Sequence, residues 1–467
     1  MTLPMHQDDA AAAFLRRTMV LLLLLLIFSL SSFPSITAEC PDGCTCEKYN
    51  VKCYKQNLDK IPDRIPPDTK ELYLIKNNIS EVKNGAFANL SQLQALFLHR
   101  NKIENIETGA FNNLTSLQEL NLDDNNIHKL DFEMFKGLTK LNTLYLSINN
   151  ISEVKNGAFA NLSKLRILFL GENKIENIET GAFNNLTSLK ILSLDDNNIH
   201  KLGSKMFKGL TKLNRLYLSK NNISEVKNGA FANLSKLRAL FLHRNKIENI
   251  ETGAFNNLAN LRVLQLDYNN IHKLDLEMFK GLTKLNSLYL DHNMIINIPP
   301  GTFDSLTSLS LLQLDNNPLT CDCNILLFVN VLKKNYPQRD VLGDNDPSCH
   351  FPVEMSEKKP LKEITENDFN CRSPEIIVAP QNKTVSVGEQ LQLSCKAVGD
   401  PEPFITWARD DIELELGQRV QVFQNNTLII SKVERTDSGK YKCVASNSLG
   451  RKSFEAMVNV NGLAENS

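Results

Sequence analysis

Residues 96–114 read LFLHRNKIENIETGAFNNL, and this stretch sets the period of most of the chain. It fits the pattern L-x-L-x-x-N-x-I-x-x-I-x-x-x-x-F-x-x-L, which recurs every 24 residues from Lys70 to Leu309. Phenylalanine fills its slot ten times, from Phe87 to Phe303. Asparagine fills its slot at Asn77, Asn101, Asn125, Asn149, Asn173, Asn197, Asn221, Asn245, Asn269, Asn293 and Asn317. Such a register predicts an array of stacked structural repeats.

Each conserved slot of the pattern has a physical role. The L-x-L alternation predicts a short strand whose leucines point to one side. One repeat cannot bury its leucines alone, so neighbouring coils must stack and share a core. An asparagine side chain both donates and accepts hydrogen bonds, and it can therefore satisfy the buried turn backbone of an adjacent coil. The phenylalanines are expected to fill the convex side, opposite the strands.

The cysteines indicate disulfides and an oxidising compartment, because the ten of them stand in three clusters. One cluster precedes the repeats, one follows them, and the third lies near the C-terminus. They are Cys40, Cys44, Cys46 and Cys53; Cys321, Cys323, Cys349 and Cys371; and Cys395 and Cys443. Four cysteines allow three pairings, and their spacing does not choose among them. A zinc site at Cys321-x-Cys323 is a less favoured alternative in a secreted protein.

A second module follows the repeats. Cys395 and Cys443 lie 48 positions apart, and Trp407 stands twelve residues after the first of them. Tyr441, two residues before the second cysteine, fits the tyrosine corner of an immunoglobulin sandwich. The match is close to the I-type immunoglobulin domains of adhesion proteins. We therefore expect an all-β sandwich over residues 374–461.

Together these features resemble the extracellular leucine-rich-repeat plus immunoglobulin family, which includes the LINGO, AMIGO and LRIG receptors and, in its N-terminal part, peroxidasin. The resemblance implies an α/β-type leucine-rich-repeat solenoid, a parallel β-sheet horseshoe, with cysteine caps. It also implies the disulfides 40–46, 44–53, 321–349 and 323–371. The sequence departs from the family in having no membrane span and no peroxidase domain, so neither receptor signalling nor haem chemistry is expected of it.

The ends and the composition point to export. Arg16-Arg17 and the apolar run Met19–Phe28 are typical of a signal peptide ending at Ala38, with a signal anchor as the alternative. We expect a signal peptide at 1–38, an N-terminal cap at 39–69, repeats at 70–318 and a C-terminal cap at 319–372. Ten N-x-Ser/Thr sequons agree with secretion: Asn78, Asn89, Asn113, Asn150, Asn161, Asn185, Asn222, Asn233, Asn382 and Asn425.

The repeats also form a longer repeating block of 72 residues, and the positions that differ between its copies indicate a binding face. Residues 77–91 recur identically at 149–163 and 221–235, so a block of 72 residues was duplicated. Between blocks the leucines stay, whereas positions beside them change, including a reversal of charge from Arg100 to Glu172. In a strand these side chains would point to the concave face. The predicted ligand-binding residues are Tyr73, Phe97, Arg100, Tyr145, Phe169, Glu172, Tyr217, Phe241, Arg244, Tyr268 and Tyr289.

The sequence predicts a secreted recognition protein whose ligand is an extracellular or cell-surface protein or a glycoconjugate. Exposed aromatics flanked by charges are what binding hot spots use, although aromatics are also ordinary on a β surface. The alternative is a structural matrix protein that self-associates, for which a homodimer is possible. Lys plus Arg is 52 and Asp plus Glu is 53, which gives no basic excess for nucleic acid. No catalytic or phosphate-binding motif stands in the sequence, so we expect no enzyme activity, no cofactor and no metal.

Overall fold

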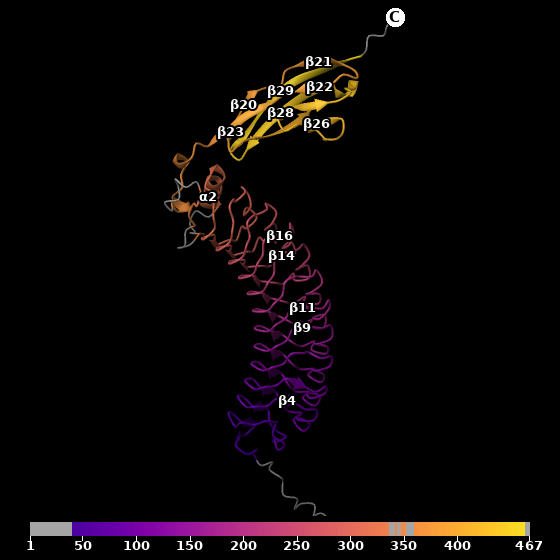
Figure 1. Ribbon diagram of the computed structural model, residues 1–467, viewed down its shortest axis with the longest axis vertical. Coiled ribbons are helices and arrows are strands. Elements are labelled where there is room, and N and C mark those ends of the chain that lie inside the picture. Colours follow the sequence, from indigo (N-terminus) through magenta and orange to yellow (C-terminus); the bar gives the residue numbers. More distant parts are fainter. Residues whose placement is uncertain (1–39, 336–340, 343–346, 352–358, 463–467) are drawn as a thin grey trace, which may run out of the picture. The chain divides into compact units, whose positions relative to one another are not determined.

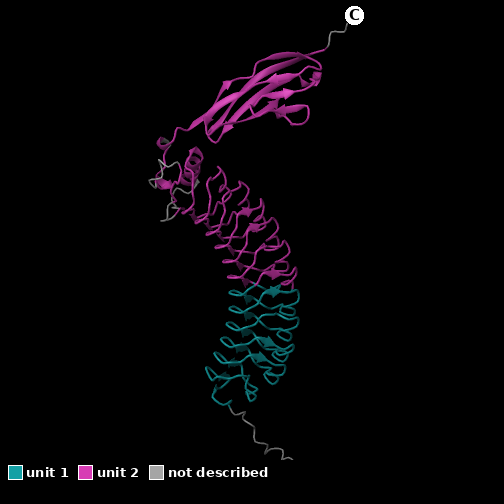
Figure 2. Cartoon of the chain, viewed as in Figure 1, with its two compact units in different colours: residues 1–174, 185–189 teal, residues 175–184, 190–467 magenta. Residues whose placement is uncertain are grey.

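The computed structural model describes residues 40–335, 341–342, 347–351 and 359–462 (Figure 1). The signal peptide expected at 1–38 lies outside them. The chain divides into two compact units (Figure 2). The first contains the described residues up to Lys174 together with Asn185–Leu189, and the second contains Ile175–Asn184 and the chain from Lys190 onward.

The first unit stacks its coils through short parallel strands. An antiparallel hairpin opens it, and the second hairpin strand pairs in parallel with the first repeat strand. Leu72 then lies opposite Leu96, and Leu144 lies opposite Leu168. The strands are β1 (Thr45–Glu47), β2 (Asn50–Lys52), β3 (Glu71–Tyr73), β5 (Ala95–Phe97), β7 (Glu119–Asn121), β8 (Thr143–Tyr145) and β10 (Ile167–Phe169). The two-residue strands β4 (Glu81–Val82), β6 (Asn105–Ile106) and β9 (Glu153–Val154) lie farther along their coils.

The second unit continues the same coil pattern. Its sheet strands are β12 (Ile191–Ser193), β13 (Arg215–Tyr217), β15 (Ala239–Phe241), β17 (Val263–Gln265), β18 (Ser287–Tyr289) and β19 (Leu311–Gln313). Its two-residue strands are β11 (Asn177–Ile178), β14 (Glu225–Val226) and β16 (Asn249–Ile250). The sheet strands pair in parallel in one register, with leucine opposite leucine. The predicted parallel-sheet solenoid is therefore confirmed.

The phenylalanine column forms the inner wall opposite the sheet. Successive rings stack with their centroids 6.0 to 6.4 Å apart from Phe87 to Phe159 in the first unit. In the second unit the column from Phe207 to Phe303 has spacings of 5.7 to 6.5 Å. These rings are buried, as are the strand leucines. Burial of this apolar surface between coils is what makes the stack stable.

The asparagine slot satisfies the turn backbone, as its chemistry predicted. In one coil Asn125 Nδ2 donates to the carbonyl oxygens of Leu98 and Leu122, at 3.1 and 3.0 Å. Its Oδ1 accepts from the backbone N–H of Ile103 at 3.0 Å. Two of these three partners belong to the preceding coil, so each asparagine joins its own turn to the coil before it. The pattern repeats as far as Asn317.

Disulfides close both ends of the repeats. At the N-terminal cap the bonds are Cys40–Cys46 and Cys44–Cys53. At the C-terminal cap they are Cys321–Cys349 and Cys323–Cys371. These are the pairs that the family resemblance implied. All four C-terminal thiols are oxidised in disulfides, which removes the ligands of the alternative zinc site at Cys321-x-Cys323.

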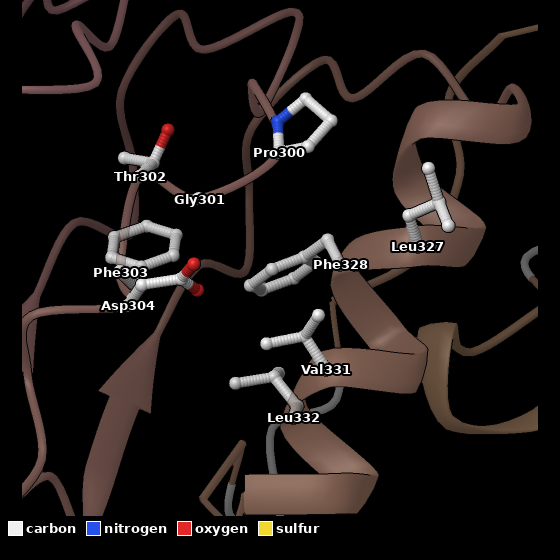
Figure 3. A pocket seen from close by; sticks show the side chains of 9 residues that line it. All are labelled: Pro300, Gly301, Thr302, Phe303, Asp304, Leu327, Phe328, Val331 and Leu332. Carbon is white, nitrogen blue, oxygen red and sulfur yellow. The ribbon is translucent and has the colours of Figure 1, made fainter. Parts of the chain in front are cut away.

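The helix α2 (Cys323–Asn335) covers the end of the phenylalanine column. Its Phe328 ring lies 5.5 Å from the ring of Phe303, the last member of the column. Figure 3 shows the two rings beside the small cavity at this junction, which measures about 20 Å³. A space of that size holds no more than a water molecule. The junction is therefore a packed cap, and it offers no small-molecule site. The cap also contains the short 3₁₀ helices η2 (Leu361–Glu363) and η3 (Glu366–Asp368).

The C-terminal part of the second unit is an immunoglobulin sandwich. One sheet has the order β21 (Lys383–Ser386), β29 (Gly450–Asn461), β28 (Gly439–Asn447), β24 (Phe404–Arg409) and β25 (Ile412–Glu413). Another has the order β22 (Leu391–Leu393), β27 (Leu428–Ile430) and β26 (Val420–Val422), and β20 (Arg372–Val378) pairs with β23 (Lys396–Asp400). The Cys395–Cys443 bond and the buried Trp407 lie in its core. Tyr441 Oη donates to the carbonyl oxygen of Asp437 at 2.9 Å, which is the predicted tyrosine corner.

A short 3₁₀ helix, η4 (Arg435–Asp437), lies between β27 and β28 in the chain.

Candidate functional site

The outer surface of the long parallel sheet, here called the sheet face, carries a row of aromatic rings. Each strand buries its central leucine and leaves the flanking residues partly exposed in most coils. In the first unit Tyr73 stacks on Phe97 and Tyr145 stacks on Phe169, with ring centroids 4.7 and 5.3 Å apart. The structure thus brings the predicted aromatic residues together in pairs, one ring from each of two adjacent coils.

The second unit repeats the arrangement once. Tyr217 and Phe241 stack with centroids 4.4 Å apart and rings inclined by 4°. The next coil has Gln265 in the same column, and Tyr289 follows it. Each pair begins a 72-residue block, and a polar residue ends the block. We call each stacked pair, Tyr73–Phe97, Tyr145–Phe169 and Tyr217–Phe241, an aromatic plate. The row thus presents flat apolar plates separated by polar residues, a surface that another molecule can contact.

Tyr73 shows how the rings are held. Its hydroxyl donates to Glu71 Oε2 at 2.6 Å, within the same strand. This hydrogen bond, together with burial, raises the pKa of Tyr73 to about 12. For Tyr145, burial raises the pKa, and the charges of Glu119 and Asp123 add to the effect. Both phenols thus stay protonated in neutral solution. Because the Tyr73 O–H is already donated to Glu71, its phenolic oxygen is left as an acceptor beside the stacked rings, whereas the Tyr145 hydroxyl can donate or accept.

Four of the predicted residues do not lie in strands, contrary to expectation: Arg100, Glu172, Arg244 and Tyr268. Each strand ends earlier in its coil. All four lie in the turn that follows, in the left-handed region, with φ between 52° and 58°. Together with their equivalents they form the turn row, which lies between the strand and the asparagine slot. The misplacement arose because period-2 alternation was extended past the short strand.

Charges in the turn row are partly paired with each other. In the first unit Arg100 Nε lies 3.6 Å from Asp124 Oδ2. In the second unit Lys220 Nζ lies 3.1 Å from Asp196 Oδ2. Both pairs are exposed, so each contributes little to stability, about 0–1 kcal/mol. Their variation between blocks therefore changes the surface without cost to the fold.

A third row lies beside the turn row and contains carboxylates. We call it the acid row, after the aspartates that stand one residue before turn-row positions. In the first unit Asp123 Oδ1 accepts from the backbone N–H of Ser147 at 2.6 Å. Burial raises the pKa of Asp123 to about 6, although this hydrogen bond opposes the shift. A half-buried carboxylate on this face is a group that a cationic ligand would stabilise.

The sequon asparagines are placed where glycan could be attached. Nine of the ten are exposed, and Asn150 is partly buried. Asn382 uses its Oδ1 to accept from the backbone N–H of Met457 at 2.7 Å, which leaves its amide nitrogen on the surface. Glycosylation of these residues stays a prediction. The described residues contain no helix that is long and apolar enough to cross a membrane.

Comparisons with known proteins decide the family. Matches to the leucine rich repeat model span residues 67–319 without a gap, which is more than half of the chain. The chain belongs to the leucine-rich repeat family. An immunoglobulin I-set domain matches at residues 374–460. This leucine-rich repeat protein therefore has the architecture of extracellular proteins of the binding or adhesion type.

Among curated relatives, a human probable oxidoreductase, PXDNL, is 33% identical over 31% of the chain and 10% of its own length. Human peroxidasin homolog is 36% identical over 28% of the chain and 9% of its own length. The human leucine-rich repeat and immunoglobulin-like domain-containing nogo receptor-interacting protein 2 is 33% identical over 32% of the chain and 25% of its own length. The aligned parts are thus at most a quarter of these relatives, and their whole-protein activities do not transfer.

A solved structure resembles a larger part of the chain. It is a chain from an octameric complex of Latrophilin 3, Unc5D and FLRT2, the last represented by its leucine-rich repeats. It is 26% identical, covers 70% of this chain and 98% of its own, and has a TM-score of 0.52. The similarity supports the solenoid fold, and the matched chain comes from a multi-protein assembly.

Proposed function

We propose that this leucine-rich repeat protein is a secreted, non-enzymatic recognition molecule that binds an extracellular or cell-surface protein through the sheet face. One observation carries the proposal: stacked aromatic pairs recur on this face, at Tyr73–Phe97, Tyr145–Phe169 and Tyr217–Phe241, partly exposed in each case. Their neighbours in the coil change charge from block to block, while the buried leucines between them do not change.

Physical reasons favour recognition at these rings. Large, rigid aromatic side chains supply contact area at little entropic cost, which is why tyrosine and tryptophan dominate binding hot spots. Stacking on the adjacent coil already fixes the rings before a ligand arrives, and this preorganisation reduces the entropy lost on binding. The phenol of Tyr73, held neutral by Glu71, adds a polar group at the edge of its plate.

The relatives are consistent with a protein ligand. The nogo receptor-interacting protein 2 is named for an interaction with a receptor, and the FLRT2 repeats are assembled with two other proteins. The oxidoreductase names belong to proteins of which this chain matches about a tenth. We therefore extend the interaction, and not the redox chemistry, to this chain. The alternative ligand is a glycoconjugate bound on the same face.

The test is a binding screen with the full secreted chain against an array of extracellular proteins. A double variant, Tyr145→Ala with Phe169→Ala, removes one plate. The matched control is Phe132→Ser, because Phe132 is a 66% exposed aromatic outside the sheet strands and the equivalent residue in the next block is Ser204. A partner that binds wild type and the control, but not the double variant, would support the sheet face.

Two other results would count against the proposal. A partner retained by all three proteins would move the site away from this plate, for instance to the exposed Phe404 and Phe454 of the immunoglobulin sandwich. Binding to the chain itself and to nothing else, with a dimer in sedimentation, would favour a self-associating matrix protein.

A further inference from the structure

The acid row changes at the C-terminal end of the solenoid. In the second unit Asp195 Oδ1 accepts from the backbone N–H of Ser219, one coil later, at 3.0 Å, and also contacts the Ser219 hydroxyl. In the following block Asp267 occupies the equivalent of Asp195, but Asp291 stands where the serine would be. Asp315 occupies the slot one coil further on. Three carboxylates thus replace the aspartate–serine pair.

These carboxylates have oxygens without partners. Oδ1 of Asp267, of Asp291 and of Asp315 is buried and accepts no hydrogen bond from the described residues. Asp291 is 8% exposed, so this unpaired oxygen belongs to a residue that is more than nine-tenths buried. A buried polar atom with no partner carries a large desolvation cost. An arrangement that leaves three of them on adjacent coils indicates that something else satisfies them.

An imidazole completes the cluster. His292 Nδ1 lies 3.0 Å from Asp291 Oδ2. The His292 ring stacks on the Tyr268 ring with centroids 4.0 Å apart. Arg244 Cζ lies 5.2 Å from the centroid of the same Tyr268 ring. The donor atoms of Asp291, His292 and Asp315 all lie within 4.8 Å of one another. The stack fixes the plane of the imidazole, as a partner in the outer shell of a metal site would.

We propose that Asp291, His292 and Asp315 form a site for a divalent transition-metal cation, with Zn²⁺ as the expected ion and Asp267 as an additional carboxylate beside it. Two carboxylate oxygens and one imidazole nitrogen are a donor set that zinc accepts, with the remaining position open to water or to another molecule. Zinc binds such donors at about 2.0–2.2 Å, so the three donor atoms, which lie within 4.8 Å of one another, would move closer together around the ion. Calcium fits less well, since it takes six to eight oxygens and avoids imidazole.

The duplicated blocks supply the test variants. Asp291→Ser restores the aspartate–serine pair that Asp195 and Ser219 form in the preceding block. His292→Lys restores the residue of that block at the same position, Lys220. Each substitution therefore installs a residue that the fold already accommodates at an equivalent position. Asp195→Asn is the matched control, because it alters an acid-row carboxylate outside the cluster.

The experiment is a calorimetric titration of the full secreted chain, freed of metal with a chelator, with Zn²⁺ alone at neutral pH. We expect one zinc ion to bind wild type and Asp195→Asn, and both cluster variants to bind it about tenfold or more weakly. Zinc should raise the melting temperature of wild type and not that of Asp291→Ser. If either cluster variant failed to be secreted, the other would decide the question.

Equal zinc binding by wild type and His292→Lys would overturn the proposal, as would the absence of zinc binding to wild type. A parallel titration with Ca²⁺ completes the design. Tighter binding of calcium than of zinc, unaffected by His292→Lys, would overturn the assignment of the imidazole as a ligand. The aromatic plates are untouched in all these variants, so this result is independent of the proposed ligand-binding function.

Discussion

The solenoid stacks aromatic rings in two places, and the two stacks behave differently. Inside each unit, the phenylalanine rings are buried and stack about 6 Å apart, and the residue type at this slot never changes. On the sheet face the rings stack more closely, at 4.4 to 5.3 Å, but only in pairs, and every third coil carries a polar residue instead. Burial fixes the first stack, whereas exposure leaves the second free to change.

The largest effect is expected from the buried stack. Phe183→Ala leaves a cavity in the middle of the array, because Phe183 is fully buried, and should lower the free energy of unfolding by about 3–5 kcal/mol. Thermal unfolding of the purified chain measures this loss of stability. Phe169→Ala, on the sheet face of the same repeat, is the control and should cost much less. Equal losses for the two variants would contradict the contrast between the stacks.

A smaller loss is expected from the asparagine slot. Asn149→Ala removes the acceptor of the Ile127 N–H and the donor to the Leu122 carbonyl, both within the core. Each buried group left unpaired costs about 1–3 kcal/mol. Asn121→Ala on the sheet face loses only a bond from the backbone N–H of Asp123 and should be nearly neutral. Hydrogen exchange at the Ile127 amide would locate the lost hydrogen bond. Unchanged protection there would argue against a stabilising role for the asparagine slot.

Breaking a sheet-face pair should affect stability least among the aromatic changes. Tyr217→Ala removes the stack on Phe241, and such a pair contributes about 0.5–1.5 kcal/mol beyond the area that it buries. We expect a small drop in melting temperature with unchanged secretion. A loss as large as that of Phe183→Ala would mean that the sheet face is a structural core rather than a binding surface.

The pH dependence of Asp123 gives the finest test. Its folded pKa, about 6, lies above the ordinary value because of burial. Its favourable contribution is therefore present below the ordinary pKa and is lost as pH rises through 6. Asp123→Asn cannot ionise and can still accept from Ser147, so its stability relative to wild type should increase between pH 4 and pH 7. A difference that stays constant over this range would show that the carboxylate is well solvated.

Much of the fold could be predicted, because repetition makes local signals add. Asn125 and Phe111 each stand in a column of identical residues, and a column has a meaning that one residue lacks. Cys395, Trp407 and Tyr441 likewise identify a sandwich by their spacing. The aromatic pairs of the sheet face were within reach as well, since Tyr145 and Phe169 differ by one period.

Other features of the candidate site were predicted wrongly or not at all. Arg100 and Tyr268 were placed on a strand, but the strand is only three residues long and the chain then turns with positive φ. The cluster around Asp291 was not predicted. Its signal lay in the column read at steps of 24, where serine becomes aspartate in the last block.

By itself the sequence determined the period, the buried slots, the presence of two modules and the use of disulfides, because each depends on residue type and spacing along the chain. Tertiary structure decided what depends on neighbours from other coils. It decided that Tyr217 lies on Phe241, and that one carboxylate oxygen, Oδ1, of Asp291 and of Asp315 has no hydrogen-bond partner among the described residues. Stacking brings residues 24 apart in sequence to within contact distance, and only there do their charges and rings act on one another.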